Sequence, residues 1–352
     1  MIGLVYPSAV FRLRGYASKM IGYFVRRLIL AFFIVWVISV LSFVIVELPE
    51  GDAVTRVHGY STQLIDPVDL KAMEDELRKY LALDRPRHIR YLTWIGNLLQ
   101  GDLGRSIGSH IGTQKAVKDL VGDRIGLTVA LTGFTILVTW TFAIPVGIYS
   151  AVRQHSIADY TFTIMGFTGI AVPDFLLGLV LMYVAYAYFD QSVGGLFSAN
   201  YIEAPWTIGK IYDLFKHLWI PAVVLGTSGT ASLIRIMRNN LLDELSKPYV
   251  VTAWAKGLGP LKLILKYPVR VAINPLISTI GYLLPSLISG SVIVSVVLSL
   301  PTLGPVLLTA VIGEDIYTAG FIILMLGILT VVGTLISDVL LAVVDPRIKF
   351  TR

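Results

Sequence analysis

The chain has 352 residues, of which 55% are hydrophobic and 15% are charged, and its mean hydropathy is +0.74. A soluble domain usually carries about 25% charged residues, so this composition indicates a polytopic membrane protein. The net charge of +6 is small for so apolar a chain, and we expect no nucleic-acid partner. Cysteine is absent, which excludes a disulfide scaffold, a thiol nucleophile and thiolate metal ligands. The histidines show no metal-ligand spacing, so we expect neither a metal site nor catalytic residues.

Apolar runs long enough to cross a bilayer predict six transmembrane helices. We place them at 23–48, 126–150, 160–189, 218–240, 274–299 and 317–344. The first run has a basic flank but no cleavage site after it, so it is interpreted as a retained signal-anchor helix. Prolines 301 and 305 interrupt the apolar stretch after the fifth span, which predicts a re-entrant or surface segment there.

Lysine and arginine near the ends of membrane spans predict the orientation of the chain. They cluster in the N-terminal segment 1–22, in the loop 241–273 and in the tail 345–352. These three segments lie on the same side of a chain with six spans. We therefore place both termini in the cytoplasm and the protein in the cell (inner) membrane.

The segment 49–125 is predicted to be a small extracytoplasmic domain that precedes a five-helix core at 126–344. Asp66 followed by Pro67 is typical of a helix start. A second helix is expected from about Pro86 to Gln100, with an apolar side formed by Tyr91, Leu92, Ile95, Leu98 and Leu99. Two interpretations stay open: a brace packed on the membrane domain, or a docking surface for an outside partner.

The inner loop 241–273 contains a short apolar helix, predicted over Tyr249–Lys256 and ended by Gly257. An apolar helix in the cytoplasm needs a cover, which can be the membrane surface or a groove on a partner protein. The residues alone leave both covers open. The chain contains no G-x-x-x-x-G-K-[ST] motif, so it resembles a pore or carrier that does not itself bind and hydrolyse nucleotide.

The run Tyr249–Leu258 reads YVVTAWAKGL and resembles the characteristic cytoplasmic loop of ABC-importer permeases. In the peptide branch this loop reads close to Y-V-x-T-A-R-A-K-G-L, so Trp254 replaces the usual Arg. Further stretches resemble the B-type permease of dipeptide and oligopeptide importers: LALDRP at 81–86, GDLG at 101–104, Pro145–Gly147, Ser156, Asp159, Pro173–Phe175, Leu300–Gly304, and the D-P-R-I ending at 345–348.

The resemblance implies an all-α, type I ABC importer permease fold with no cofactor bound by this chain. It implies a second homologous permease, two cytoplasmic ATPase subunits that hold ATP and Mg, an extracytoplasmic substrate-binding protein and the lipid bilayer as partners. The chain would not be an enzyme, because the ATPase subunits supply hydrolysis. The resemblance also implies an ATPase-coupling loop whose contact residues are Tyr249, Thr252, Ala253, Ala255, Lys256, Gly257 and Leu258.

Asp174 lies within a predicted span, and such residues usually face the protein interior or a watery cavity. It is a candidate for the translocation path, where it could bind the amino group of a peptide. The other interpretation is a carboxylate that caps a break at Pro173 or pairs with the second permease. Hydroxyls form the remaining candidate path set: Ser228, Thr230, Ser286 and Ser289. Ser and Thr also serve as close-packing residues between membrane helices.

A path lined by hydroxyl groups suits hydrogen-bonding substrates of more than one class. The resemblance favours an importer of di- and oligopeptides, and an oligosaccharide importer of the same group is the alternative. An ion-coupled secondary transporter is a weaker alternative, because such proteins need inverted repeats and often several intramembrane carboxylates. The sequence contains no clear repeat, and Asp174 is the one acidic residue well inside a span.

Overall fold

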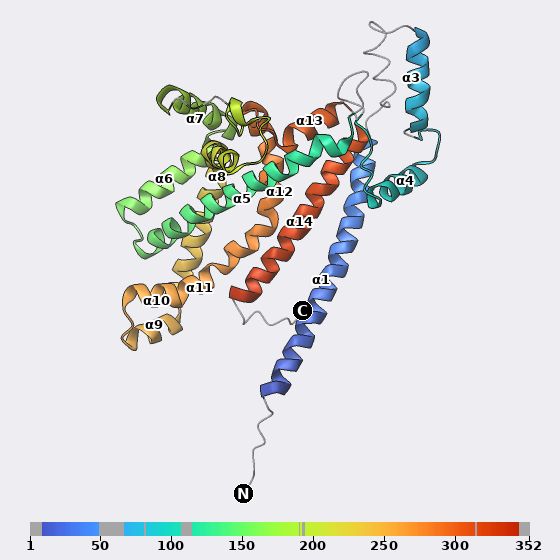
Figure 1. Ribbon diagram of the computed structural model, residues 1–352. Helices are drawn as coiled ribbons and strands as arrows, with labels where there is room; N and C mark the ends of the chain where they lie inside the picture. Colours follow the sequence, from blue (N-terminus) through green and yellow to red (C-terminus); the bar gives the residue numbers. More distant parts are fainter. Residues whose placement is uncertain are drawn as a thin grey trace.

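The computed structural model describes residues 9–48, 67–80, 82–106, 115–189, 191, 194–313 and 315–344. Within these ranges the elements are helical, which confirms the all-α prediction (Figure 1). They are α1 (Ala9–Val46), α3 (Pro67–Tyr80), α4 (Arg87–Leu99), α5 (Val117–Val152), α6 (Ile157–Ala171), α7 (Asp174–Phe189), the 3-10 turn η1 (Ala199–Tyr201), α8 (Ile208–Leu245), α9 (Pro248–Ala255), α10 (Pro260–Lys266), α11 (Pro268–Ala272), α12 (Asn274–Val297), α13 (Leu303–Ile312) and α14 (Ile316–Val344). The segment 49–66 and the ending 345–348 lie outside the described residues.

Four helices of the described part are long and apolar enough to cross a membrane: α1, α5, α8 and α14. Counting each of two bent helix pairs as one span raises the number to six. Large apolar side chains on these helices face outward; Phe32 on α1, for example, is 77% exposed. A lipid environment accommodates such surface, and the chain is a multi-pass membrane protein.

The third predicted span, 160–189, is not one continuous helix. α6 ends at Ala171, α7 begins at Asp174, and the two are bent by 104° relative to each other. Pro173 explains the break, because proline lacks an N–H and disfavours the helical conformation of the residue before it. Val172 is accordingly extended, with φ −83° and ψ 126°. The apolar run concealed the break because both halves are apolar.

Two other predicted spans are shorter than the helices that contain them. α5 begins at Val117 rather than at 126, and α8 extends beyond both ends of 218–240. Charged residues near the start of α8 interrupted the apolar pattern, but the fold buries two of them, Lys210 and Asp213. Lys210 donates a hydrogen bond to the carbonyl of Ala204 at 2.6 Å, and Asp213 accepts one from the hydroxyl of Ser198 at 2.7 Å.

The segment after α12, predicted to be re-entrant or at the surface, contains a short apolar helix, α13, which begins at Leu303 and includes Pro305. The Thr128 hydroxyl accepts a hydrogen bond at 3.0 Å from the backbone N–H of Leu303, the first residue of α13. A Cβ on Gly304 would lie 3.1 Å from the Cα of Val292, so glycine lets α13 lie close against α12. These contacts attach α13 to the bundle between α5 and α12.

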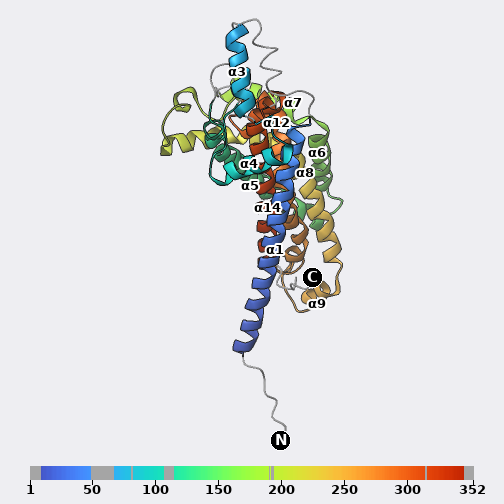
Figure 2. The ribbon, with the colours of Figure 1, turned by 90° about the vertical axis from the view of Figure 1, so that its right-hand side faces the viewer.

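Small residues bring the central helices α5 and α8 together. A Cβ on Gly147 would lie 2.7 Å from the Cβ of Met237, and one on Gly226 would lie 2.7 Å from Thr139 Oγ1. Glycine thus permits a close approach that any side chain would prevent, as is common between membrane helices. At the edge of the bundle α1 packs on α14, and its N-terminal end extends beyond the other helices (Figures 1 and 2).

The helix α4 packs on the C-terminal end of α1 and on the N-terminal part of α14. Trp94 is 4% exposed and shares a cluster with Phe43 of α1 and Leu324 of α14. This packing supports the interpretation of α4 as a brace. Tyr91, Ile95 and Leu98 contribute to the cluster as expected, whereas Leu92 and Leu99 are 64% and 85% exposed and do not belong to the packed side.

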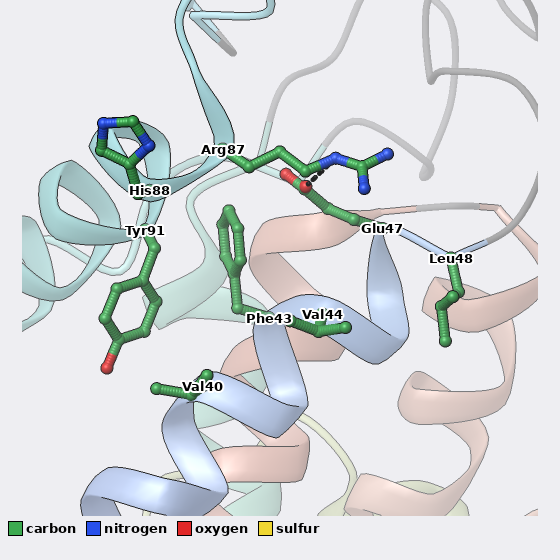
Figure 3. Close-up of a pocket in the computed structure, with 8 residues that line it drawn as sticks. All are labelled: Val40, Phe43, Val44, Glu47, Leu48, Arg87, His88 and Tyr91. Atoms are coloured by element: carbon green, nitrogen blue, oxygen red, sulfur yellow. Dashed lines mark ion pairs between the residues drawn. The ribbon is translucent and has the colours of Figure 1, made fainter.

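An open pocket of about 270 Å³ lies between the outer end of α1 and the start of α4. Figure 3 shows Phe43 and Tyr91 along its wall and Glu47 beside Arg87. The carboxylate of Glu47 lies 2.7 Å from Arg90 Nη2 and 3.7 Å from Arg87 Nε. Burial raises the pKa of Glu47, although the positive charges of both arginines oppose this shift. Glu47 and the two arginines therefore lie together where the brace meets α1.

Candidate coupling surface and translocation path

The inner loop is a hairpin of two short helices at the end of the bundle opposite α7 (Figure 1). α8 leads into α9 through Ser246 and Lys247, and Pro248 occupies the first helical turn, where its missing N–H costs nothing. The chain reverses at Gly257, whose φ of +78° is a left-handed conformation that favours glycine. Gly259 and Pro260 then start α10. The predicted helix and its glycine stop are therefore present.

The sides of α9 and α10 that face each other form a small apolar cluster. Val250 and Ala253 of α9 are buried against Leu263 of α10. Ala253 is 7% exposed, so it packs within the hairpin. This placement differs from the expectation that its small side chain faces a partner protein.

The outer face of the hairpin is apolar and exposed. Trp254 is 67% exposed, Val251 57% and Leu261 72%, although each is a large hydrophobic side chain. Among the other predicted contact residues, Thr252, Ala255, Lys256 and Gly257 are exposed, Leu258 is half-buried, and Tyr249 is exposed with its hydroxyl donating to the carboxylate of Glu244. Exposed large apolar side chains are candidates for an interaction surface.

The candidate path residues lie on three helices that pack on one another: α7, α8 and α12. Asp174 is the half-buried first residue of α7, at the break that follows α6. Ser228 and Thr230 are half-buried on α8, and Ser286 is exposed on α12, where its hydroxyl donates to the carbonyl of Leu283 at 3.0 Å. Ser289 is also on α12, but its side chain lies outside the described residues.

Asp159 and Arg238, which lie far apart in the sequence, form a close pair in the fold. The guanidinium of Arg238 donates two hydrogen bonds of 2.9 Å to the two carboxylate oxygens of Asp159. Asp159 is 2% exposed and also accepts from the backbone N–H of His155 at 3.0 Å. The spacing of Ser156 and Asp159 is typical of a helix start, and Ser156 does cap α6. No local pattern indicates the partner on α8.

Among the described residues, no group of three or more His, Asp or Glu side chains could hold a metal ion. The coupling hairpin, residues 248–266, carries exposed cations beside its apolar face, including Lys256 and Lys262. Such a surface fits a groove on a protein partner or the membrane surface.

Comparison with known proteins places this architecture in a family. The family described as "Binding-protein-dependent transport system inner membrane component" matches residues 143–350, which contain the coupling hairpin. The oligopeptide transport system permease protein AppB of Bacillus subtilis is 34% identical over 332 residues, covering 94% of this chain and 100% of that protein. Two DppB permeases are each 29% identical and cover 95% of this chain and 100% of their own length: the di/tripeptide protein of Pseudomonas aeruginosa and the dipeptide protein of Escherichia coli. The chain belongs to the family of inner membrane components of binding-protein-dependent transport systems.

Proposed function

We propose that this chain is a permease subunit of an ATP-driven importer and forms half of a translocation path for di- and oligopeptides. Its membership of the inner membrane component family supports the transport role. The printed functions of three relatives, oligopeptide, di/tripeptide and dipeptide transport, support a peptide substrate. The oligosaccharide alternative is not favoured, because the relatives compared above are all named for peptides.

The exposed apolar face of the coupling hairpin is the observation that carries the proposal. This chain has no nucleotide-binding motif, so another subunit must supply ATP hydrolysis. Trp254 and Val251 present an apolar surface on the side where basic loops predict the cytoplasm. An ATPase groove covers this surface more specifically than lipid does. Thr252, Ala255 and Lys256 then contact the ATPase, while Ala253 supports the hairpin from within.

The assembly contains a second homologous permease, two ATPase subunits and an extracytoplasmic binding protein that delivers peptide. Both termini of this chain lie in the cytoplasm. Asp174, Ser228, Thr230, Ser286 and Ser289 lie near the path, since α7, α8 and α12 pack together and Asp174 stands at a helix break. Discontinuous helices commonly form substrate sites in transporters.

The proposal is tested by purifying the tagged chain from its native membranes in mild detergent. The eluate is assayed for vanadate-sensitive ATPase activity, with binding protein loaded with peptide or with oligosaccharide. We expect a second permease and ATPases to co-elute, and peptide-loaded binding protein to raise the activity. Isolation of the chain with neither ATPase subunits nor activity contradicts the importer, and stimulation by the oligosaccharide-loaded protein alone contradicts the peptide substrate.

A further inference from the structure

A buried ion pair joins the inner end of α6 to α8. Arg238 presents its guanidinium fork to both oxygens of Asp159, which is the strongest geometry available to this pair. Asp159 is almost fully buried, so removal of either partner leaves a charge without compensation. The two helices are therefore held together at this point.

The contact between α6 and α8 continues toward the outer end of α6. The guanidinium of Arg235 lies 4.7 Å from the ring centroid of Phe167. Further along, a Cβ on Gly169 would lie 2.6 Å from Thr227 Cγ2, so the backbone of α6 lies directly against α8. Contacts thus run from the first turn of α6 to its last, and the two helices form one packed unit.

The two ends of the α6–α8 unit connect differently to the rest of the chain. At the inner end α8 continues into the coupling hairpin, and the hydroxyl of Tyr249 donates to Glu244 at the end of α8. At the outer end the helical hydrogen-bond ladder stops at Val172, and α7 leaves at 104°. Proline is a usual cause of a sharp change in helix direction. Asp174 follows immediately after this point.

We propose that Asp159 and Arg238 are positioning residues that make α6 move as one body with α8. A displacement of the coupling hairpin by an ATPase is then delivered through α8 and α6 to the break at Val172 and Pro173, beside Asp174. Without the ion pair, α8 moves while α6 lags behind. This inference rests on the proposed function and deepens it, since it identifies the helices that transmit movement from the ATPase to the translocation path.

The experiment uses the complete transporter in proteoliposomes and measures peptides transported per ATP hydrolysed. Asp159→Asn keeps the side-chain shape and removes the charge. We expect this ratio to fall by about tenfold, in the range of known coupling effects, with subunit assembly and basal ATPase activity unchanged. The reversed pair, Asp159→Arg with Arg238→Asp, should recover part of the loss.

Asp338→Asn is the matched control. It removes another interhelical ion pair of the same chain, between Arg27 of α1 and Asp338 of α14 at 2.7 Å, which lies outside the α6–α8 unit. The control should keep the wild-type ratio of transport to hydrolysis. An equal fall in the control and in Asp159→Asn would mean a general loss of stability and would contradict the inference.

A second measurement does not depend on how well the Asn variant assembles. The chain contains no cysteine, so spin labels can be placed at introduced cysteines in the otherwise wild-type protein. We expect the distance between Ile157→Cys on α6 and Asn239→Cys on α8 to stay constant on trapping with ATP and vanadate. The distance between Ile157→Cys and Tyr183→Cys on α7 should change.

The outcomes separate this inference from the proposed function. A wild-type complex without ATP-dependent uptake contradicts the proposed function itself. A wild-type complex that transports peptide, but whose α6–α8 distance changes during the cycle, contradicts only the inference. Normal coupling in both Asp159→Asn and Arg238→Lys contradicts it as well.

Discussion

At the scale of single residues, the backbone of Gly257 decides the shape of the coupling hairpin. Its φ is +78°, and a Cβ built on it would meet no atom within 4 Å. Space is therefore available for a side chain, and the conformation alone requires glycine. Gly259, two residues later, is equally unobstructed but has an ordinary φ of −60°. The two glycines make a matched pair.

Gly257→Val should strain the turn and displace the apolar face of α9 from its partner. Left-handed backbone costs a side-chain-bearing residue about 1–2 kcal/mol, roughly a fivefold to thirtyfold change in an equilibrium constant. We expect uptake in proteoliposomes to fall by a similar factor while the complex keeps its basal ATPase activity. Gly259→Val should transport normally. Wild-type uptake by Gly257→Val would refute the coupling role of this turn.

Asp174→Asn tests whether this carboxylate binds the amino group of a peptide. A hydrogen bond to a charged group contributes about 1.5–3 kcal/mol, so the apparent KM for uptake should rise roughly tenfold to a hundredfold. N-acetylated peptides lack the charge and should be transported equally by both proteins. An unchanged KM for free peptides would instead support a carboxylate that caps the helix break at Pro173.

At the scale of elements, the observed helices differ from those predicted by hydropathy in two places, one at a proline and one at buried charged residues. Pro173 divides an apolar run into α6 and α7, and buried Lys210 and Asp213 belong to the N-terminal part of α8, which the predicted span 218–240 did not include. α4 meets α1 at Trp94, which packs on Phe43, and at the half-buried carboxylate of Glu47 beside Arg90. The attachment of α4 therefore contains a titratable group.

The attachment of α4 should depend on pH through Glu47. Burial raises its pKa in the folded protein above the ordinary 4.5, despite the neighbouring Arg90 and Arg87. A carboxyl group with a higher pKa in the folded protein than in the unfolded protein stabilises the fold fully when the pH is below its unfolded-state pKa. This contribution is lost as the pH rises through its folded-state pKa. Hydrogen exchange of α4 amides, corrected for intrinsic rates, should reveal weaker protection as pH rises through this window. Glu47→Gln should remove that dependence, and its persistence in the variant would exclude Glu47 as the cause.

At the scale of the whole molecule, the basic loops predict which end of the helix bundle lies in the cytoplasm. The coupling hairpin lies at one end of the bundle, while α7 and the outer domain lie at the other (Figure 1). Family membership shows a membrane component of a transport system, and the proposed ATPase contact requires the hairpin to be cytoplasmic. The orientation itself is therefore worth a direct measurement.

Single cysteines in this cysteine-free chain provide that measurement. Gln154 lies in the turn between α5 and α6, and Glu203 lies in the segment before α8; both are exposed. We expect a membrane-impermeant maleimide to label Glu203→Cys in intact cells and Gln154→Cys only after permeabilisation. The opposite pattern would place the coupling hairpin outside and refute the assignment of an ATPase contact.

Local patterns alone predicted a multi-pass membrane protein with six helical spans and a short helix ended by glycine in the loop 241–273. Apolar runs, prolines and glycines act on their immediate neighbours in the chain, so their effect can be read without a fold. Tertiary packing decided which side of α9 is buried, and it turned Ala253 inward. It also paired Asp159 with Arg238 across 79 positions of sequence, because packed helices bring together residues that no local pattern relates.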